Sequence, residues 1–279
     1  CRYIASNGKF EKIPLPVNSS QSNLFVNSLL EDTGRQCIWI GTEGYLFQYF
    51  TSTGQMKQTE AFHNNSIKSL ALDGNGDLLA GTDNGLYVYH NDVTPLQHII
   101  HDSRNIQSLT NNIIWNIFAD QEHNIWLGTD YGISLSRYNS ALQFIPISQI
   151  TGTGDGNQFY SLFRDSKGFY WFGGTNGLIR FTDPAGDKHN AIWYRMGDKT
   201  YPLSHNRIRH IYEDKEQQLW IATDGSINRY DYATRQFVHY NIVDSTGTYN
   251  TNWTYYMFED NAGHLWISTC LGGIFVEIG

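Results

Sequence analysis

The chain repeats one sequence pattern six times over its 279 residues. Each copy contains an apolar stretch, an Asp that opens a turn, a strand centred on Trp or Leu, a Gly/Thr step and a closing strand. The paired anchors of the copies are Asp32 and Trp39, Asp73 and Leu79, Asp120 and Trp126, Asp165 and Trp171, Asp214 and Trp220, and Asp260 and Trp266. Successive Trp or Leu anchors lie 40, 47, 45, 49 and 46 residues apart. This period, with about four strand signals per copy, predicts an all-β fold, a β-propeller of four-stranded antiparallel blades.

The two ends of the sequence are complementary within this pattern. Arg2–Tyr3 and Phe10–Leu15 read as the end of one strand and an outer strand, whereas the sixth copy supplies three strands and then stops. The N-terminal strand can complete the last blade and leave no open sheet edge. We therefore expect a single β-propeller domain over residues 1–279, a fragment of a larger chain, with six blades closed by a shared blade. A seven-bladed parent ring that lacks one blade here is the alternative.

The composition argues against several classes of function. The chain has 19 Lys and Arg against 27 Asp and Glu, a net charge of −8, which argues against a nucleic-acid partner. Its three Cys lack CxxC spacing, so neither a disulfide framework nor a zinc site is predicted. No run of 18 apolar residues occurs, so no membrane contact by this chain is expected. No cofactor is predicted. No metal is predicted either, because Asp73–Asp77 lacks the bidentate Glu of a calcium loop.

The repeated Asp and Trp have structural interpretations. The Asp side chain can accept a hydrogen bond from the backbone two residues on, and a Gly such as Gly168 supplies a positive φ angle in the same turn. The five repeated Trp are expected to pack between adjacent blades, with Leu79 in the equivalent position of the second copy.

Positions that vary between the copies are candidates for ligand specificity. Three residues before each Asp the residue is always apolar: Leu29, Leu70, Ile117, Leu162, Ile211 and Met257. Five residues before each Asp it varies: Asn27, Lys68, Trp115, Tyr160, Arg209 and Tyr255. The first set indicates core, and the second mixes aromatic rings with two cations. Eight residues before the Asp, five copies have Asn, which suits a cap at the entry to the inner strand.

Aromatic rings beside Arg and Asn are typical of a sugar-binding rim, because rings cover the apolar faces of sugars and planar polar groups bond their hydroxyls. The candidate ligand-binding residues are Trp115, Tyr160, Arg207, Arg209, Trp253, Tyr255, Asn112, Asn206, Tyr131 and Asn176. Packing between blades is the alternative function of the same side chains.

No catalytic residues are predicted. The sequence contains no phosphate-binding loop and no GxSxG motif, and its ten His form no metal-binding motif. Paired carboxylates for glycosidic cleavage stay open, because Asp130, Asp224 and Glu43 could meet across the central channel.

The string from Asp165 to Leu178, DSKGFYWFGGTNGL, resembles the two-component regulator propeller repeat. The resemblance extends over essentially the whole chain, with departures such as Leu79 for Trp and Ala222 for Gly. It implies the periplasmic sensor region of a hybrid two-component histidine kinase/response regulator of polysaccharide-degrading gut bacteria. Such a region would respond to an oligosaccharide and control a phosphorelay and transcription. An adjacent propeller or sandwich domain and a homodimer partner are expected in the parent protein.

Three classes of function follow from these observations. The first is a non-catalytic oligosaccharide sensor, which is the expected one. The second is a propeller enzyme acting on polysaccharides, a lyase or glycosidase. The third is a protein-interaction scaffold, which the acidic balance of the chain would suit.

Overall fold

The computed structural model describes residues 2–4, 9–16, 24–90, 97–138, 145–146, 158–182, 191–200, 202–244, 246, 251–270 and 273–276. All regular elements in these ranges are β-strands. Within the same ranges, no helix has the length and apolar character needed to cross a membrane. The all-β class predicted from the sequence is confirmed.

Three sheets have the four antiparallel strands predicted for a blade, with strands in chain order from the inside outward. The first contains β9 (Ile114–Ala119), β10 (Ile125–Thr129), β11 (Gly132–Ser136) and β12 (Ile145–Pro146). The second contains β13 (Phe159–Arg164), β14 (Tyr170–Gly174), β15 (Gly177–Phe181) and β16 (Ile192–Tyr194). The third contains β17 (Ile208–Glu213), β18 (Leu219–Thr223), β19 (Ile227–Asp231) and β20 (Gln236–Tyr240). They correspond to the third, fourth and fifth copies of the repeat.

The first two copies share one six-stranded sheet. Its strands are β3 (Val26–Asp32), β4 (Cys37–Phe50), β5 (Met56–Leu72), β6 (Leu78–Thr82), β7 (Gly85–Tyr89) and β8 (Gln97–Ile99). The first part of β5 pairs with β4, and its last part, from Ile67 on, pairs with β6. A single long strand therefore ends one copy and begins the next.

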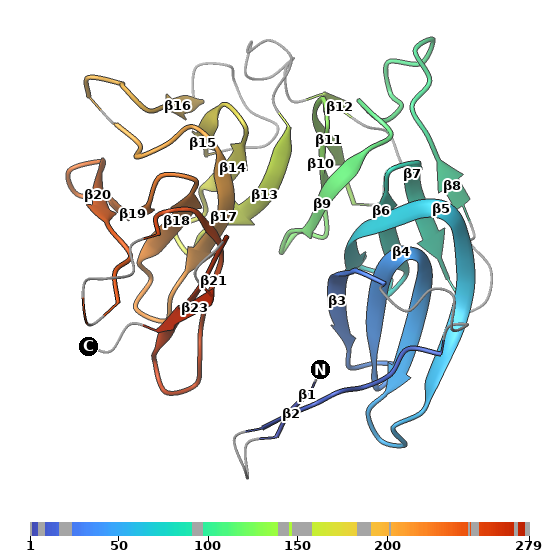
Figure 1. Cartoon of the computed structure of the whole chain (residues 1–279). Helices are drawn as coiled ribbons and strands as arrows, with labels where there is room; N and C mark the ends of the chain where they lie inside the picture. Colours follow the sequence, from blue (N-terminus) through green and yellow to red (C-terminus); the bar gives the residue numbers. More distant parts are fainter. Residues whose placement is uncertain are drawn as a thin grey trace.

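The sixth copy forms the three-stranded sheet of β21 (Thr254–Glu259), β22 (Leu265–Thr269) and β23 (Gly273–Val276). β1 (Arg2–Ile4) pairs with β2 (Lys9–Glu11) in a separate two-stranded sheet. This pairing joins the two strand segments expected at the N-terminus, and the completion of the last blade by them stays a prediction. Figure 1 shows the sheets in an arc in chain order, with β3 and β21–β23 on opposite sides of its open end.

The repeated Asp holds its turn as predicted, through one carboxylate oxygen. In all six copies Oδ1 accepts backbone N–H donors of the turn, such as those of Lys167 and Phe169 on Asp165. The other oxygen, Oδ2, has a function that the sequence did not indicate. It accepts the indole N–H of the Trp in its own copy at 2.7–3.0 Å in all five copies that have one. Each Asp therefore fixes both a turn and the orientation of a Trp.

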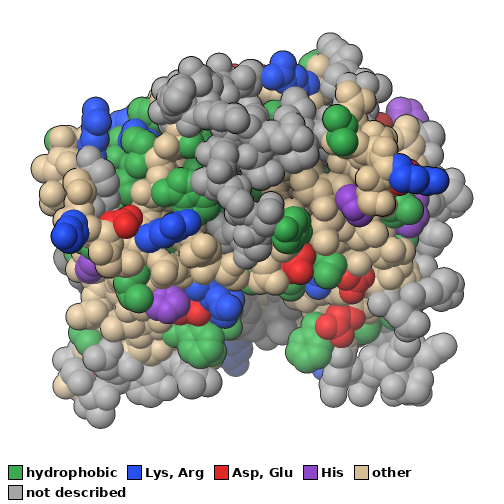
Figure 2. Space-filling model, turned by 90° about the horizontal axis from the view of Figure 1, so that it is seen from above, with side chains coloured by type: hydrophobic (Ala, Val, Ile, Leu, Met, Phe, Trp, Pro, Cys, Tyr) green, Lys and Arg blue, Asp and Glu red, His purple; other side chains and the backbone are tan. Residues whose placement is uncertain are grey.

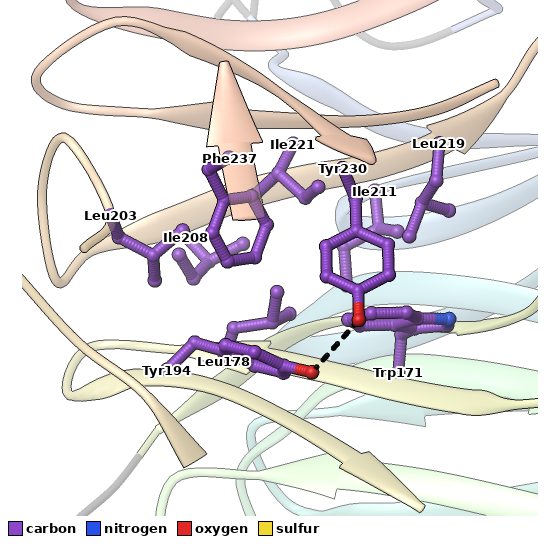
Figure 3. Close-up of a cluster of buried hydrophobic side chains, with 10 residues drawn as sticks. All are labelled: Trp171, Leu178, Tyr194, Leu203, Ile208, Ile211, Leu219, Ile221, Tyr230 and Phe237. Carbon is purple, nitrogen blue, oxygen red and sulfur yellow. Dashed lines mark hydrogen bonds between the residues drawn. The ribbon is translucent and has the colours of Figure 1, made fainter. Parts of the chain in front are cut away.

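The Trp rings pack against the next copy, as expected. Trp39, Trp126 and Trp171 are at most 1% exposed, and Trp220 is also buried. Figure 3 shows Trp171 and Tyr194 of one blade against Ile208, Ile211 and Tyr230 of the next. The hydroxyls of Tyr194 and Tyr230 lie 3.2 Å apart, so this interface also contains a hydrogen bond. Trp266, in the last copy, is only partly buried.

A second contact joins the inner strands of successive copies. In four copies, the side chain four residues before the Asp accepts a hydrogen bond from a backbone N–H of the next copy. The donor is the residue three before the Asp of that next copy. The acceptors are Ser28, Ser69, Ser161 and His210, and the respective donors are Leu70, Ile117, Ile211 and Met257 at 3.0–3.2 Å. A polar ladder therefore lines the inner strands inside the Trp layer.

The two end blades have uncovered apolar side chains. At the apolar position three before the Asp, the side chains of the later five copies are buried. Leu29, in the first copy, is 65% exposed, and Phe258 on β21 of the last copy is 46% exposed. Each end blade therefore exposes apolar side chains of the kind that are buried between adjacent blades in the rest of the molecule.

Leu70→Ala should lower the free energy of unfolding by about 2–5 kcal/mol, because it removes a buried side chain from between two blades. Leu29→Ala, at the equivalent exposed position, should change it by less than about 1 kcal/mol. Urea denaturation monitored by Trp fluorescence measures both values. Equal losses in the two variants would contradict the difference in packing described above.

His210 should make stability depend on pH. Burial lowers the pKa of His210 to about 4, and its Nδ1 accepts the N–H of Met257 while its ring stacks on Tyr256 at 3.9 Å. As the pH falls from about 6.5 to about 4, the unfolded chain takes up a proton that the folded chain does not. The free energy of unfolding should therefore fall by up to about 3 kcal/mol over this range.

The matched variant for this test is His210→Ser, because Ser occupies the equivalent position in three other copies. The variant should lose the part of the pH dependence that His210 contributes, whatever its absolute stability. Denaturation curves from pH 4 to pH 7.5 compare the two proteins. Parallel pH profiles would show that His210 is not the titrating group.

Candidate functional site

The variable position of each copy lies on a β-bulge. In every copy the register between the inner strand and its neighbour shifts at the residue five before the Asp, which has no paired partner. The buried residues on either side of it are three apart, as in Ile208 and Ile211, where a regular strand would place them two apart. A bulge redirects the side chain of its extra residue. Lys68, Trp115, Tyr160, Arg209 and Tyr255 are therefore available for contacts outside the core.

These bulge residues form a continuous series of contacts from the second copy to the sixth. The ammonium of Lys68 lies 4.5 Å from the ring centre of Trp115, whose ring packs edge-on against Tyr160 at 5.4 Å. The guanidinium of Arg209 lies 6.0 Å from the ring of Tyr160 and 4.8 Å from that of Tyr255. The rim cluster is defined by these residues and their polar partners: Lys68, Trp115, Asp130, Gln158, Tyr160, Arg207, Arg209, Asp224, Trp253 and Tyr255.

A hydrogen-bond network joins the third and fourth copies in this cluster. Asp130 accepts the indole N–H of Trp115 at 3.0 Å and the amide N–H of Gln158 at 2.6 Å. The hydroxyl of Tyr160 donates to the amide oxygen of Gln158. Burial raises the pKa of Tyr160, against the opposing charges of Arg207 and Arg209. The network fixes the two aromatic rings and keeps the phenol protonated.

Arg209 is held by a carboxylate from the turn after β18. Its Nε and Nη2 donate to the two oxygens of Asp224 at 2.6 Å and 3.2 Å. Burial disfavours the charged guanidinium, but the hydrogen bonds and the charge of Asp224 outweigh that effect and raise the pKa of Arg209. Arg207 reaches the same carboxylate at 3.8 Å, with 43% of its side chain exposed. One carboxylate therefore faces two guanidinium groups.

Two exposed rings continue the cluster on the last copy. Trp253 and Tyr255 are 39% and 41% exposed, and their rings are nearly parallel with centres 6.3 Å apart. The guanidinium of Arg209 lies 5.8 Å from the ring of Trp253 as well as close to Tyr255. Aromatic faces that are held in place and open to solvent can stack on a ligand.

The structure brings together six of the candidate residues predicted from the sequence: Trp115, Tyr160, Arg207, Arg209, Trp253 and Tyr255. Asn112 and Asn206 lie outside the rim cluster. Their side-chain oxygens accept the backbone N–H groups of His101 at 2.6 Å and Met196 at 2.7 Å, so they hold the loops that precede the inner strands. Tyr131 and Asn176 are exposed in the turns before β11 and β15, also outside the cluster as defined above.

Sequence reasoning did not assign Asp130, Gln158, Asp224 or Lys68 to the ligand site, although three of them were noted for other reasons. A spacing of 15 residues would have indicated the two carboxylates. It separates Trp115 from Asp130 and Arg209 from Asp224, and both pairs are hydrogen-bonded. The same spacing separates Tyr255 from Cys270, and burial, followed by Cys270, raises the pKa of Tyr255. The turn residue that follows the second strand thus faces the bulge residue of its own copy.

Comparison with known proteins identifies the repeat. Residues 108–131, 153–176 and 202–225 match the family model of the two component regulator propeller. These three segments are two component regulator propeller repeats. The matched segments include Trp115, Tyr160 and Arg209, whereas Lys68, Trp253 and Tyr255 of the rim cluster lie outside them.

Three known proteins are similar to the chain. Histidine kinase P4 of Formosa agariphila is 26% identical over 240 residues, which are 77% of this chain and 16% of the kinase. A solved structure of B. thetaiotaomicron, described as the extracellular domain of the hybrid two component system BT4673, is 94% identical with a TM-score of 0.49, over 99% of this chain and 37% of that one. The extracellular domain of BT3049 from the same organism is 21% identical with a TM-score of 0.65, over 93% and 40%.

The chain thus spans well under half the length of each of these proteins. The similarity of coordinates to the BT3049 domain supports the propeller fold.

Asp224→Asn should lower the free energy of unfolding by about 1–3 kcal/mol, because it leaves the largely buried guanidinium of Arg209 without its charged acceptor. Asp102→Asn is the matched control, since it breaks an exposed pair with Arg104, whose side chain is 89% exposed, and should cost at most about 1 kcal/mol. Chemical denaturation compares the two variants. A loss no greater in Asp224→Asn than in the control would contradict a structural role for the pair.

Proposed function

We propose that the chain is the extracytoplasmic ligand-sensing propeller of a hybrid two-component signalling protein and that its ligand is an oligosaccharide bound at the rim cluster. The observation that carries the proposal is the continuous contact series of bulge residues from five copies of the repeat. The regulator propeller repeats and the similarity to a histidine kinase support the signalling context.

The chemistry of the rim cluster suits a sugar. Trp253 and Tyr255 offer exposed aromatic faces for the apolar face of a sugar ring. Arg207, Gln158 and Asp130 offer planar polar groups whose hydrogen bonds have a defined direction, which suits hydroxyl recognition. The hydrogen bonds already present within the cluster hold these groups in place, so little conformational entropy is lost on binding.

Binding here can influence the arrangement of the blades. The side chains of the cluster come from successive copies. A ligand that contacts several of them would therefore bind some arrangements of the blades more tightly than others. Such a difference is the condition for a ligand to shift a conformational equilibrium. In the parent protein this shift would bias a histidine kinase in the membrane, a phosphorelay and transcription, with the propeller in the periplasm beside a further propeller or sandwich domain and within a homodimer.

The proposed function of this chain is binding without turnover. Asp130 is engaged by Trp115 and Gln158, and Asp224 is engaged by Arg209. Both carboxylates hold neighbouring side chains in position, which is a function in building the site.

The triple variant Trp115→Ala, Arg209→Ala and Tyr255→Ala should lose oligosaccharide binding while it stays folded. A thermal-shift screen of the wild-type chain against defined neutral and acidic oligosaccharides identifies the ligand. A ligand at 100 times its Kd stabilises the folded state by about 2.7 kcal/mol, which raises the melting temperature measurably. The triple variant should show no such shift.

The control is the double variant Arg104→Ala and Met196→Ala, which removes two exposed side chains outside the rim cluster. It should respond to the ligand as the wild type does. Circular dichroism checks that all variants are folded. A folded triple variant with unchanged affinity would place the ligand elsewhere, and the absence of any shift with every sugar would contradict oligosaccharide sensing by this chain.

A further inference from the structure

On the fifth copy, the cations of the rim cluster outnumber the carboxylates. Arg207 and Arg209 share the single carboxylate of Asp224, whereas Asp83 occupies the equivalent turn position in the copy of Lys68. The chain as a whole has a net charge of −8. On the face seen in Figure 2, basic side chains are scattered among hydrophobic and acidic ones and form no extended basic surface there. On the fifth copy two guanidinium groups thus share one carboxylate, although the chain as a whole is acidic.

The excess charge falls on Arg207. Both oxygens of Asp224 already accept hydrogen bonds from Arg209, whose side chain is only 16% exposed. Arg207 reaches that carboxylate at 3.8 Å, beyond hydrogen-bonding distance, and 43% of its side chain is exposed. Asp224 therefore neutralises Arg209 first, and the guanidinium of Arg207 keeps donors directed to solvent.

Arg207 lies at the start of the inner strand that neighbours the strand of the exposed rings. Arg207 and Trp253 are both the residue seven before the Asp of their copies, and Arg209 and Tyr255 are both the bulge residue. The inner strands of these copies, β17 and β21, are joined by the bond between His210 and Met257. The exposed guanidinium and the exposed aromatic pair thus belong to adjoining strand ends.

An exposed guanidinium near exposed aromatic rings suits a sugar that carries an anionic group. A guanidinium presents parallel N–H donors that match the two oxygens of a carboxylate or sulfate group, and the rings match the apolar face of a sugar. Resting on the proposed function, we propose that the oligosaccharide recognised at the rim cluster is anionic, and that Arg207 binds its carboxylate or sulfate group while Trp253 and Tyr255 stack on the sugar. Arg207 is then the residue that selects acidic over neutral sugars.

The test compares acidic oligosaccharides with their neutral twins by isothermal titration calorimetry on the whole chain. One arm uses oligogalacturonates and their methyl esters, and the other uses sulfated N-acetyllactosamines and their unsulfated parents. At least one acidic probe should bind ten-fold or more tightly than its twin, since a hydrogen bond to a charged group has about this effect. The arm that shows the preference distinguishes a uronate from a sulfate ester.

Arg207→Gln should lower the ratio of the affinity for the preferred acidic probe to that for its neutral twin about ten-fold or more, whatever the change in the affinity for the neutral twin. Arg104→Gln removes the same charge from an exposed loop and should change neither. Raising the salt concentration from about 0.05 M to about 0.5 M should weaken the acidic probe selectively, because screening acts on the charge.

The outcomes separate the two proposals. Binding of neutral twins as tight as that of the acidic probes, lost in the Trp115/Arg209/Tyr255 triple variant, would overturn the anionic ligand and keep the sensor function. An acidic preference that persists in Arg207→Gln would overturn the role of Arg207. Binding of no probe at all would contradict both proposals.

Discussion

The hydrogen bond between the repeated Asp and the indole of its own Trp is the interaction on which the other blade contacts depend. One carboxylate oxygen closes the turn, and the other orients a large ring that packs against the next copy. In two copies that second oxygen also accepts a hydroxyl from the next blade, Tyr170 on Asp120 and Tyr232 on Asp165. Local turn geometry and packing between blades are thus coupled through a single side chain, which explains why both residues recur together.

This rigid frame makes the bulge a position where sequence can vary. The bulged residue has no partner in the ladder and does not enter the core, so its identity has little effect on the fold. The same geometry occurs in each copy, so the side chains of Trp115, Tyr160 and Arg209 contact one another although nearly fifty residues separate each from the next. The rim cluster thus forms because the same β-bulge recurs in each copy.

The sequence predicted the fold class and the ring of variable residues because both follow from a period and an internal comparison. It did not predict the bulge itself, although apolar residues three apart, such as Ile208 and Ile211, signal it within a strand. It indicated two strand segments at the N-terminus, which pair with each other as β1 and β2, whereas their completion of the last blade stays a prediction. For Asn112 the sequence favoured a cap at the strand entry, whereas its side chain accepts the N–H of His101, eleven residues earlier, a partner that no short motif indicates.

The last copy is the part of the molecule where a bound ligand has most to add. Its Trp266 is only partly buried and Phe258 is 46% exposed, so its core contributes fewer contacts than that of the copies before it. The ladder N–H of this copy, on Met257, donates to the ring nitrogen of the neutral His210 instead of a Ser hydroxyl. A ligand held by Arg207 on one side and by Trp253 and Tyr255 on the other would bridge this same interface. The free energy of binding would then act directly on the blade that the rest of the structure holds least firmly.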